Sequence, residues 1–305
     1  GPYKGGTLIS MSIALRLFVL LGASVCYASI SPVPMSTNVL LPNAFSGKNV
    51  LVTGATSGIG KATAMRFLEL GAKVTFLGRN KEALEKIFEE NKHTGRVYTA
   101  VADLSRVEAC DSSVNEAFNK MGGLDILVNN AGILIARGKN VMTTTVEEFE
   151  QTLNTNLRAP FFLIQSAAKR MQRGSVIVNV GSLAGTRTIP NLTIYSVSKA
   201  ALESLTKCAA LELADKGIRV NSINPATVMT EIFKRSGMSD EMCDSYVKEN
   251  SKLHPLGRVG YPEDCASMIT FIASDGAAWL TGQCIGLDGG RSLCVPAASQ
   301  LLRED

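Results

Sequence analysis

Short runs of apolar and β-branched residues recur along the chain, and segments of helical character separate them. Such runs, without polar alternation, are typical of parallel strands that are buried on both faces of a sheet. Seven runs fit this description, at residues 49–53, 73–77, 96–102, 124–128, 175–180, 218–223 and 283–288. Helical segments are expected at residues 61–70, 81–91, 147–173, from 194 to about 214, and 262–273. This alternation predicts an α/β fold: a doubly wound parallel sheet of seven strands with helices on both faces, in one domain at residues 46–293.

Residues 1–45 form an N-terminal extension that does not share this pattern. Residues 17–30 carry no charge, and these 14 residues are fewer than the roughly 20 that a membrane-spanning helix needs. Small residues at 26–29 are typical of a signal peptide, while the absence of acidic residues before Glu69 would also suit an organelle transit segment. A membrane anchor with Arg16 at its edge, which would give membrane association, and an extension that packs on the domain are the other interpretations.

The apolar segment favours a targeting signal or an anchor over simple packing, but it does not fix a compartment. Three prolines in residues 31–42 predict a linker, and residues 294–305 form a C-terminal tail. The seven cysteines are scattered, without a C-x-x-C pair, which favours a reducing intracellular compartment for the domain.

The composition also bears on the class of function. The net charge of +4 is small and no basic run with interleaved aromatic residues is present, so nucleic-acid binding is not expected. The cysteine spacing matches neither a disulfide framework nor a zinc site. With only two histidines, His93 and His254, a histidine-based metal site or a Ser-His-Asp triad is poorly supported. We therefore predict no metal site.

A glycine-rich turn, Gly54-Ala-Thr-Ser-Gly58-Ile-Gly60, joins the first expected strand to the first expected helix. In this setting the backbone N–H groups and the helix dipole favour an anion, and glycine lets the backbone approach it closely. An ordinary tight turn is the alternative. The strand-turn-helix context favours binding of a dinucleotide.

The second expected strand ends at Gly78-Arg79-Asn80. An acidic residue there would bond the ribose 2′-hydroxyl of NAD, whereas an arginine suits the 2′-phosphate of NADP. Arg79 therefore favours NADPH or NADP over NADH or NAD, with a solvated arginine at a helix start as the alternative. Asp103 and Leu104 end the third strand, where the carboxylate could accept from an adenine amino group or cap the next helix.

Two further segments would lie at the carboxyl ends of the strands. Asn129-Asn130-Ala131-Gly132 could steady this edge of the sheet and let a cofactor ring approach, or it could be a plain turn. Residues 226–255 are polar, without a strand signal, and suit a lid over a substrate. The lid contains Met229, Met238 and Met242, which suggest an adaptable apolar pocket or only packing.

The main candidate for chemistry is the pair Tyr195 and Lys199, four residues apart and hence on one face of a helix. A lysine ammonium beside a phenol is expected to lower the phenol pKa, and such a tyrosine can pass a proton to or from an oxygen. Ser182 follows the fifth strand at the edge where ligands bind in such sheets. Asn156 lies inside an expected helix that Pro160 should kink or interrupt, so Asn156 bonds the backbone locally or serves a site.

Residues 47–293 strongly resemble the short-chain dehydrogenase/reductase family, in its shorter, one-domain form with a Rossmann-type fold. The resemblance is carried by Thr53-Gly54-x-x-x-Gly58-x-Gly60, Asp103, Asn129-Asn130-Ala131-Gly132, Asn156, Ser182, Tyr195-x-x-x-Lys199, Pro225–Thr230 and Asp288-Gly289-Gly290. Ala226 stands where the family commonly has glycine. Residues 256–290 look most like the 3-oxoacyl-carrier-protein reductase and small carbonyl reductase branches, whose members are usually homodimers or homotetramers built through the long helices and the last strand.

The resemblance implies a role for each of four catalytic residues. Tyr195 would be the general acid/base, Lys199 would tune its pKa and bind the nicotinamide ribose, Ser182 would hold the substrate carbonyl, and Asn156 would support a water and proton relay. The cofactor-binding residues expected are Gly54, Thr56, Ser57, Gly58, Ile59, Gly60, Arg79, Asp103, Leu104, Asn130, Ala131, Gly132, Tyr195, Lys199, Pro225, Val228 and Thr230.

We therefore expect an NADPH-dependent enzyme that reduces a ketone or aldehyde, or in reverse oxidises an alcohol, with a small-molecule substrate that the sequence does not identify. An NAD-dependent alcohol or steroid dehydrogenase is the second interpretation. A cofactor-binding scaffold protein that has lost catalysis is the third, and the complete set of catalytic residues argues against it.

Overall fold

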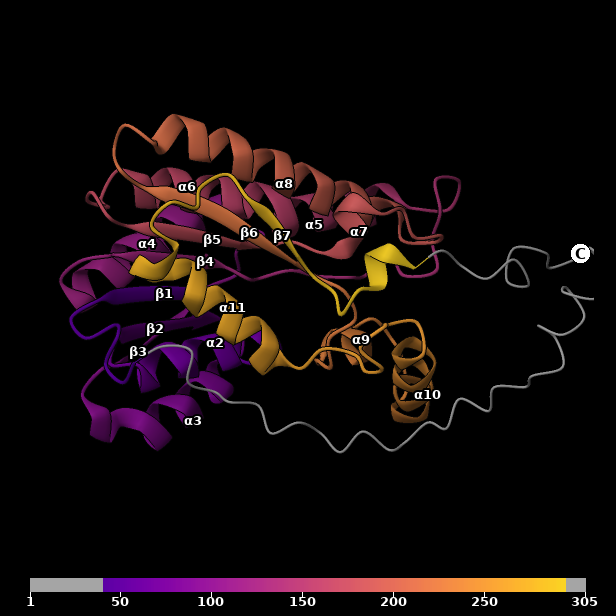
Figure 1. Ribbon diagram of the computed structural model, residues 1–305, viewed down its shortest axis with the longest axis horizontal. Helices are drawn as coiled ribbons and strands as arrows, with labels where there is room; N and C mark the ends of the chain where they lie inside the picture. The colour runs from indigo at the N-terminus through magenta and orange to yellow at the C-terminus, as the bar shows by residue number, and fades with distance from the viewer. Residues whose placement is uncertain (1–40, 295–305) are drawn as a thin grey trace, which may run out of the picture. The chain divides into compact units, whose positions relative to one another are not determined.

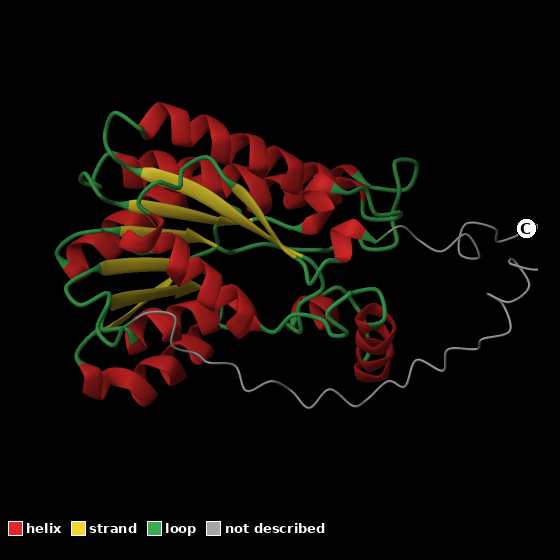
Figure 2. Ribbon diagram, in the orientation of Figure 1, coloured by secondary structure: helices red, strands yellow, loops and turns green. Residues whose placement is uncertain are grey.

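In the computed structural model, which describes residues 41–294, a seven-stranded parallel sheet is covered on both faces by helices (Figures 1 and 2). The strands are β1 (Asn49–Thr53), β2 (Lys73–Gly78), β3 (Val97–Val101), β4 (Ile126–Asn129), β5 (Val176–Val180), β6 (Arg219–Pro225) and β7 (Cys284–Leu287). The longer helices are α2 (Gly58–Glu69), α3 (Lys81–Asn91), α4 (Val107–Met121), α5 (Val146–Leu153), α6 (Ala159–Ala168), α8 (Thr193–Leu213), α10 (Asp240–Ser251) and α11 (Pro262–Ala273). Single turns form α7 (Leu183–Thr186), α9 (Ile232–Arg235), η1 (Lys92–Thr94), η2 (Asn154–Arg158), η3 (Asp275–Ala277) and η4 (Arg291–Leu293).

The order of the strands confirms the doubly wound fold. It runs β3-β2-β1-β4-β5-β6-β7, so the direction of winding reverses between β1 and β4. Ligands in such sheets bind beyond the carboxyl ends of the strands, at this reversal. Figure 2 shows all the strand arrows pointing toward the end of the domain where α7, α9 and α10 lie.

Alternating side chains of the strands supply two apolar cores, one on each face of the sheet. Val50 and Val52 of β1 pack with α2, α3 and α11, whereas Leu51 between them packs with α4, α6 and α8. This alternation follows from the period of two in a strand, and burial on both faces explains why the strands read as continuous apolar runs. Phe45 is buried and meets Phe67 edge to face at 4.9 Å, so the packed unit reaches at least to Phe45.

The expected long helix at 147–173 is broken into three parts. A π-helical turn at Asn154–Arg158 separates α5 from α6, and Pro160 stands in the first turn of α6. Because proline has no N–H group, the Asn156 carbonyl lacks its normal helical donor. The N–H of Ala159 bonds to the Asn154 carbonyl, five residues back, which is the spacing of a π-helix. The interruption expected at Pro160 is confirmed.

The expected targeting segment, the anchor alternative and the last residues of the C-terminal tail lie outside the described residues. Within 41–294, no helix has the length and apolar character needed to cross a membrane. No group of histidine, cysteine and acidic side chains suited to a metal ion occurs in this part of the chain either.

Candidate active site

A cleft of about 750 Å³ opens at the carboxyl ends of the strands, on both sides of the reversal between β1 and β4. Nearly all of the residues predicted to bind cofactor or substrate line it. Gly60 and Asn156 are the two that do not line it, and both are buried behind its wall.

The glycine-rich turn is held against the end of β4 by close backbone contacts. Gly54 and Gly58 have positive φ values of 64° and 52°, which residues other than glycine rarely adopt. A Cβ atom on Gly54 would lie 2.9 Å from the Ala131 Cα atom, and one on Gly60 would overlap the Gly54 carbonyl oxygen and the Asn130 amide. These glycines therefore let the turn pack where any side chain would intrude.

Asn130 ties the two strand ends at the reversal together. Its Nδ2 group donates to the carbonyl oxygens of Thr53 at 2.9 Å and Gly54 at 3.2 Å. In return the Thr53 hydroxyl accepts from the backbone N–H groups of Asn130 and Ala131, at 2.9 and 3.0 Å. The cluster Asn129-Asn130-Ala131-Gly132 therefore steadies this edge of the sheet, which was one of the two interpretations of its sequence.

Arg79 and Asp103 lie at the rim of the cleft. Arg79 is exposed and makes no hydrogen bond or ion pair with any residue of the described part. Asp103 does not cap α4, contrary to one of its two predicted roles: the N-cap is Arg106, and Asp103 Oδ1 accepts from the Ser105 N–H at 3.1 Å in the turn before it.

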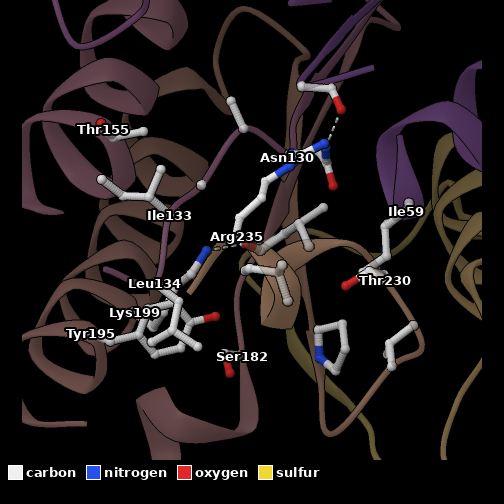
Figure 3. Close-up of a pocket in the computed structure, with 18 of the residues that line it drawn as sticks. Ile59, Asn130, Ile133, Leu134, Thr155, Ser182, Tyr195, Lys199, Thr230 and Arg235 are labelled. Atoms are coloured by element: carbon white, nitrogen blue, oxygen red, sulfur yellow. Dashed lines mark hydrogen bonds between the residues drawn. The ribbon is translucent and has the colours of Figure 1, made fainter. Parts of the chain in front are cut away.

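Tyr195 and Lys199 lie one turn apart on α8, and Ser182 caps α7 directly after β5. Figure 3 shows the three side chains gathered in one part of the cleft. The Ser182 Oγ atom accepts from the Ala184 N–H at 3.2 Å, and Lys199 Nζ donates to the Val180 carbonyl at 2.8 Å. The ammonium nitrogen lies 5.8 Å from the centre of the Tyr195 ring.

The electrostatics of this pair differ from the prediction. Burial raises the pKa of the Tyr195 phenol, with the hydrogen-bonding interaction with Ser182 acting in the opposite direction. Burial also lowers the pKa of Lys199 to about 8. The expected lowering of the phenol pKa by Lys199 is therefore wrong for this structure, because burial is the main cause of the shift and Lys199 Nζ donates to the Val180 carbonyl. A phenol with a pKa at or above its ordinary value carries its proton at neutral pH, so Tyr195 can act as a proton donor.

Asn156 positions the segment that follows β4. Its Oδ1 atom accepts from the Ile133 N–H at 2.8 Å, and its Nδ2 group donates to the Ile133 carbonyl at 3.0 Å and to Ser198 Oγ at 3.1 Å. The Asn156 side chain that makes these bonds is fully buried. These backbone bonds go to Ile133, 23 residues away, and not to the local helix as one alternative expected, and the part of Asn156 in a proton relay stays a prediction.

The segment 226–255 bears α9 and α10 and forms one wall of the cleft, so we call it the lid. None of its three methionines is among the lining residues, so the apolar pocket suggested by them is not made by methionine. The larger apolar side chains that this segment contributes to the lining are instead those of Val228, Ile232, Phe233 and Tyr246. Tyr246 stacks under the guanidinium of Arg137 at 4.7 Å, which connects the lid to the segment after β4.

Sequence reasoning missed several residues of the cleft. The side chains that were not predicted include Ile135, Gln151, Thr155, Arg187, Ile189, Arg235 and Arg291. They come from loops, helix ends and the lid, where no period of apolar residues or motif marks a side chain as facing a cavity. Ala226 stands where the family resemblance leads one to expect glycine. Its φ is not positive, so the position does not require glycine, and its N–H donates to the Leu287 carbonyl at 3.2 Å.

Comparison with known proteins finds relatives of this chain. The family model described as enoyl-(acyl carrier protein) reductase matches residues 54–292. An uncharacterized oxidoreductase of Thermotoga maritima is 39% identical over 252 residues, covering 81% of this chain and 98% of the relative. The 3-oxoacyl-[acyl-carrier-protein] reductase FabG of the same organism is 37% identical, with coverage of 80% and 97%. A crystal structure of a short chain dehydrogenase from Burkholderia cenocepacia J2315 in complex with NADP superimposes with a TM-score of 0.74 at 30% identity, covering 81% of this chain and 99% of that one.

Proposed function

The chain belongs to the short-chain dehydrogenase/reductase family and is an NAD(P)-dependent oxidoreductase, and on this basis we propose that it reduces a ketone or aldehyde with NADPH. The observation that carries the proposal is the placement of Ser182, Tyr195 and Lys199 in one cleft with the glycine-rich turn.

The residues of the cleft fit a dinucleotide. The N-terminus of α2 offers backbone N–H groups for a diphosphate, and the positive φ values of Gly54 and Gly58 shape the turn that leads to it. Gly132 lines the cleft where a Cβ atom would lie 3.4 Å from Asn156 Oδ1 and 3.6 Å from Lys199 Nζ. Nicotinamide cofactors supply a hydride, and the protein supplies orientation and proton transfer.

The roles that we propose for the side chains follow from their chemistry. The Ser182 hydroxyl donates a hydrogen bond to the substrate carbonyl oxygen, which polarises the bond and holds it beside Tyr195. The Tyr195 phenol gives its proton to this oxygen as negative charge develops there. Lys199, on the next turn of α8, would bind the nicotinamide ribose from the place where its Nζ atom donates to the Val180 carbonyl.

The proposal predicts NADPH consumption that depends on an added carbonyl compound. We expect the purified protein to oxidise NADPH, followed at the nicotinamide absorbance, with at least one member of a panel of apolar ketones and aldehydes, since the cleft wall carries Ile189, Ile232 and Phe233. The same panel with NADH serves as the comparison. Binding of NADPH without any carbonyl-dependent oxidation would instead favour a protein that only binds the cofactor.

Arg79 is the residue that we propose to select NADPH over NADH. It is exposed at the cleft rim after β2, has no partner in the described residues, and no acidic residue takes its place at this strand end. The NADP complex of the Burkholderia relative supports this choice of cofactor.

Replacing Arg79 with Ser should weaken NADPH binding by roughly 10- to 100-fold, since a charge-assisted hydrogen bond contributes about 1.5–3 kcal/mol. NADH binding should change little, because it lacks the 2′-phosphate. Titration of each cofactor by fluorescence gives both dissociation constants. Equal losses for the two cofactors, or none, would contradict a role for Arg79 in reading the phosphate.

We also propose that the protein works as a homo-oligomer. Trp279 is fully exposed and Leu211 of α8 is 81% exposed. Strand β7 stands at the edge of the sheet with its partner on one side only. Apolar side chains and an unpaired strand edge of this kind support association with a second copy.

A further inference from the structure

Arg235, the last residue of α9, reaches from the lid to the glycine-rich turn. Its Nη2 group donates to the Ser57 hydroxyl at 2.8 Å, although 178 positions separate the two residues in the chain. Figure 3 shows this side chain crossing the cleft, and both residues are among those that line it. The bond links the lid directly to the turn that begins α2.

The guanidinium of Arg235 lies at the wrong end of a helix for a cation. Ser57 is the N-cap of α2, and its hydroxyl makes no capping bond to the helix, so it is left to accept from Arg235. The N-terminus of a helix carries a partial positive charge, and a cation there is unfavourable. The first turn of α2 contains no acidic residue, and Arg235 forms no ion pair with a carboxylate among the described residues. An anion placed between the two positive groups would remove this conflict.

We propose that Arg235 is a phosphate-binding residue carried by the lid, and that it binds a phosphate group of the dinucleotide at the N-terminus of α2. The inference rests on the proposed function, because the cofactor is its ligand. Two phosphates carry the required charge: the diphosphate, which the α2 N-terminus attracts, and the 2′-phosphate, which Arg79 is proposed to read. Either one would bridge the lid and the glycine-rich turn.

This contact would couple the cofactor to the substrate pocket. Ile232 and Phe233 lie in the same single helical turn as Arg235 and line the cleft. A phosphate that fixes Arg235 therefore also fixes the apolar wall formed by these two side chains. The expected consequence is an order of binding, with the cofactor first and the carbonyl substrate second.

The test compares Arg235→Gln with a matched variant, Lys248→Gln. Lys248 is exposed on α10 of the same lid and does not line the cleft, so the two variants lose the same charge at different places. Isothermal titration should show NADPH binding about tenfold weaker in Arg235→Gln and unchanged in Lys248→Gln. An equal loss for NADH would assign the diphosphate, whereas a loss for NADPH alone would assign the 2′-phosphate.

A second readout follows the lid itself. On addition of NADPH, hydrogen exchange of residues 232–251 should slow in the wild type and in Lys248→Gln, and much less in Arg235→Gln. Wild-type affinity in Arg235→Gln, or equal losses in both variants, would overturn the inference while leaving the proposed function in place. A wild-type protein that binds neither cofactor would overturn the proposed function itself. Thermal unfolding of the cofactor-free variants checks that all three proteins are folded.

Discussion

Tyr195→Phe should lower kcat for carbonyl reduction by about 10²- to 10⁴-fold, the usual contribution of a positioned general acid. The change removes one hydroxyl and keeps the ring in its place on α8. The Tyr195 phenol carries the proton that the product oxygen needs, and phenylalanine carries none. Steady-state rates of NADPH oxidation measure the loss. Titration of NADPH should show that the cofactor still binds.

Tyr246→Phe is the matched control for this experiment. Tyr246 also lines the cleft, from α10, and its ring contacts Phe233 and the Arg137 guanidinium. Those contacts involve the ring, so removal of the hydroxyl should leave kcat nearly unchanged. Substantial turnover in Tyr195→Phe would mean that another group supplies the proton, and the assignment of Tyr195 would fail. Equal losses in the two variants would point to general damage to the cleft.

The parts of the fold that the sequence predicts closely are those with strong local signals. The helix at 81–91 begins after Asn80, whose side chain accepts from the Ala83 N–H at 2.8 Å, and the helix at 262–273 begins with proline. The strand at 49–53 is a β-branched run buried on both faces. Each of these segments contains the information for its own boundary, so both ends agree with the structure.

The features that the sequence does not predict depend on contacts between distant segments. The bond from Arg235 to Ser57 has no local signature, because each residue alone is an ordinary polar side chain. The pKa of Tyr195 was predicted from its helical neighbour Lys199, but burial by the surrounding walls decides it. A pattern places residues on a helix face or at a strand end. Desolvation and the direction of a long side chain are set only when the whole cleft is assembled.

Gly60→Ala is the substitution that we expect to damage the fold and the cofactor site together. A Cβ atom on Gly60 would overlap the Gly54 carbonyl oxygen and the Asn130 Nδ2 group, and neither can move freely. Asn130 Nδ2 bonds the carbonyls of Thr53 and Gly54, so a shift would break the link between the ends of β1 and β4. Overpacking of this kind costs about 3 kcal/mol, which urea unfolding would measure as a lower midpoint.

Gly286→Ala separates this steric effect from the general cost of replacing glycine. Gly286 lies in β7 with no atom within 4 Å of the added Cβ, and neither glycine has a positive φ. Gly286→Ala should therefore unfold at the wild-type midpoint and bind NADPH normally, while Gly60→Ala unfolds earlier and binds it weakly. The contrast distinguishes lost space from lost backbone freedom, because the two variants add the same methyl group. If Gly60→Ala matched Gly286→Ala in both measurements, the close contact of α2 with the end of β4 would not be what shapes the phosphate site.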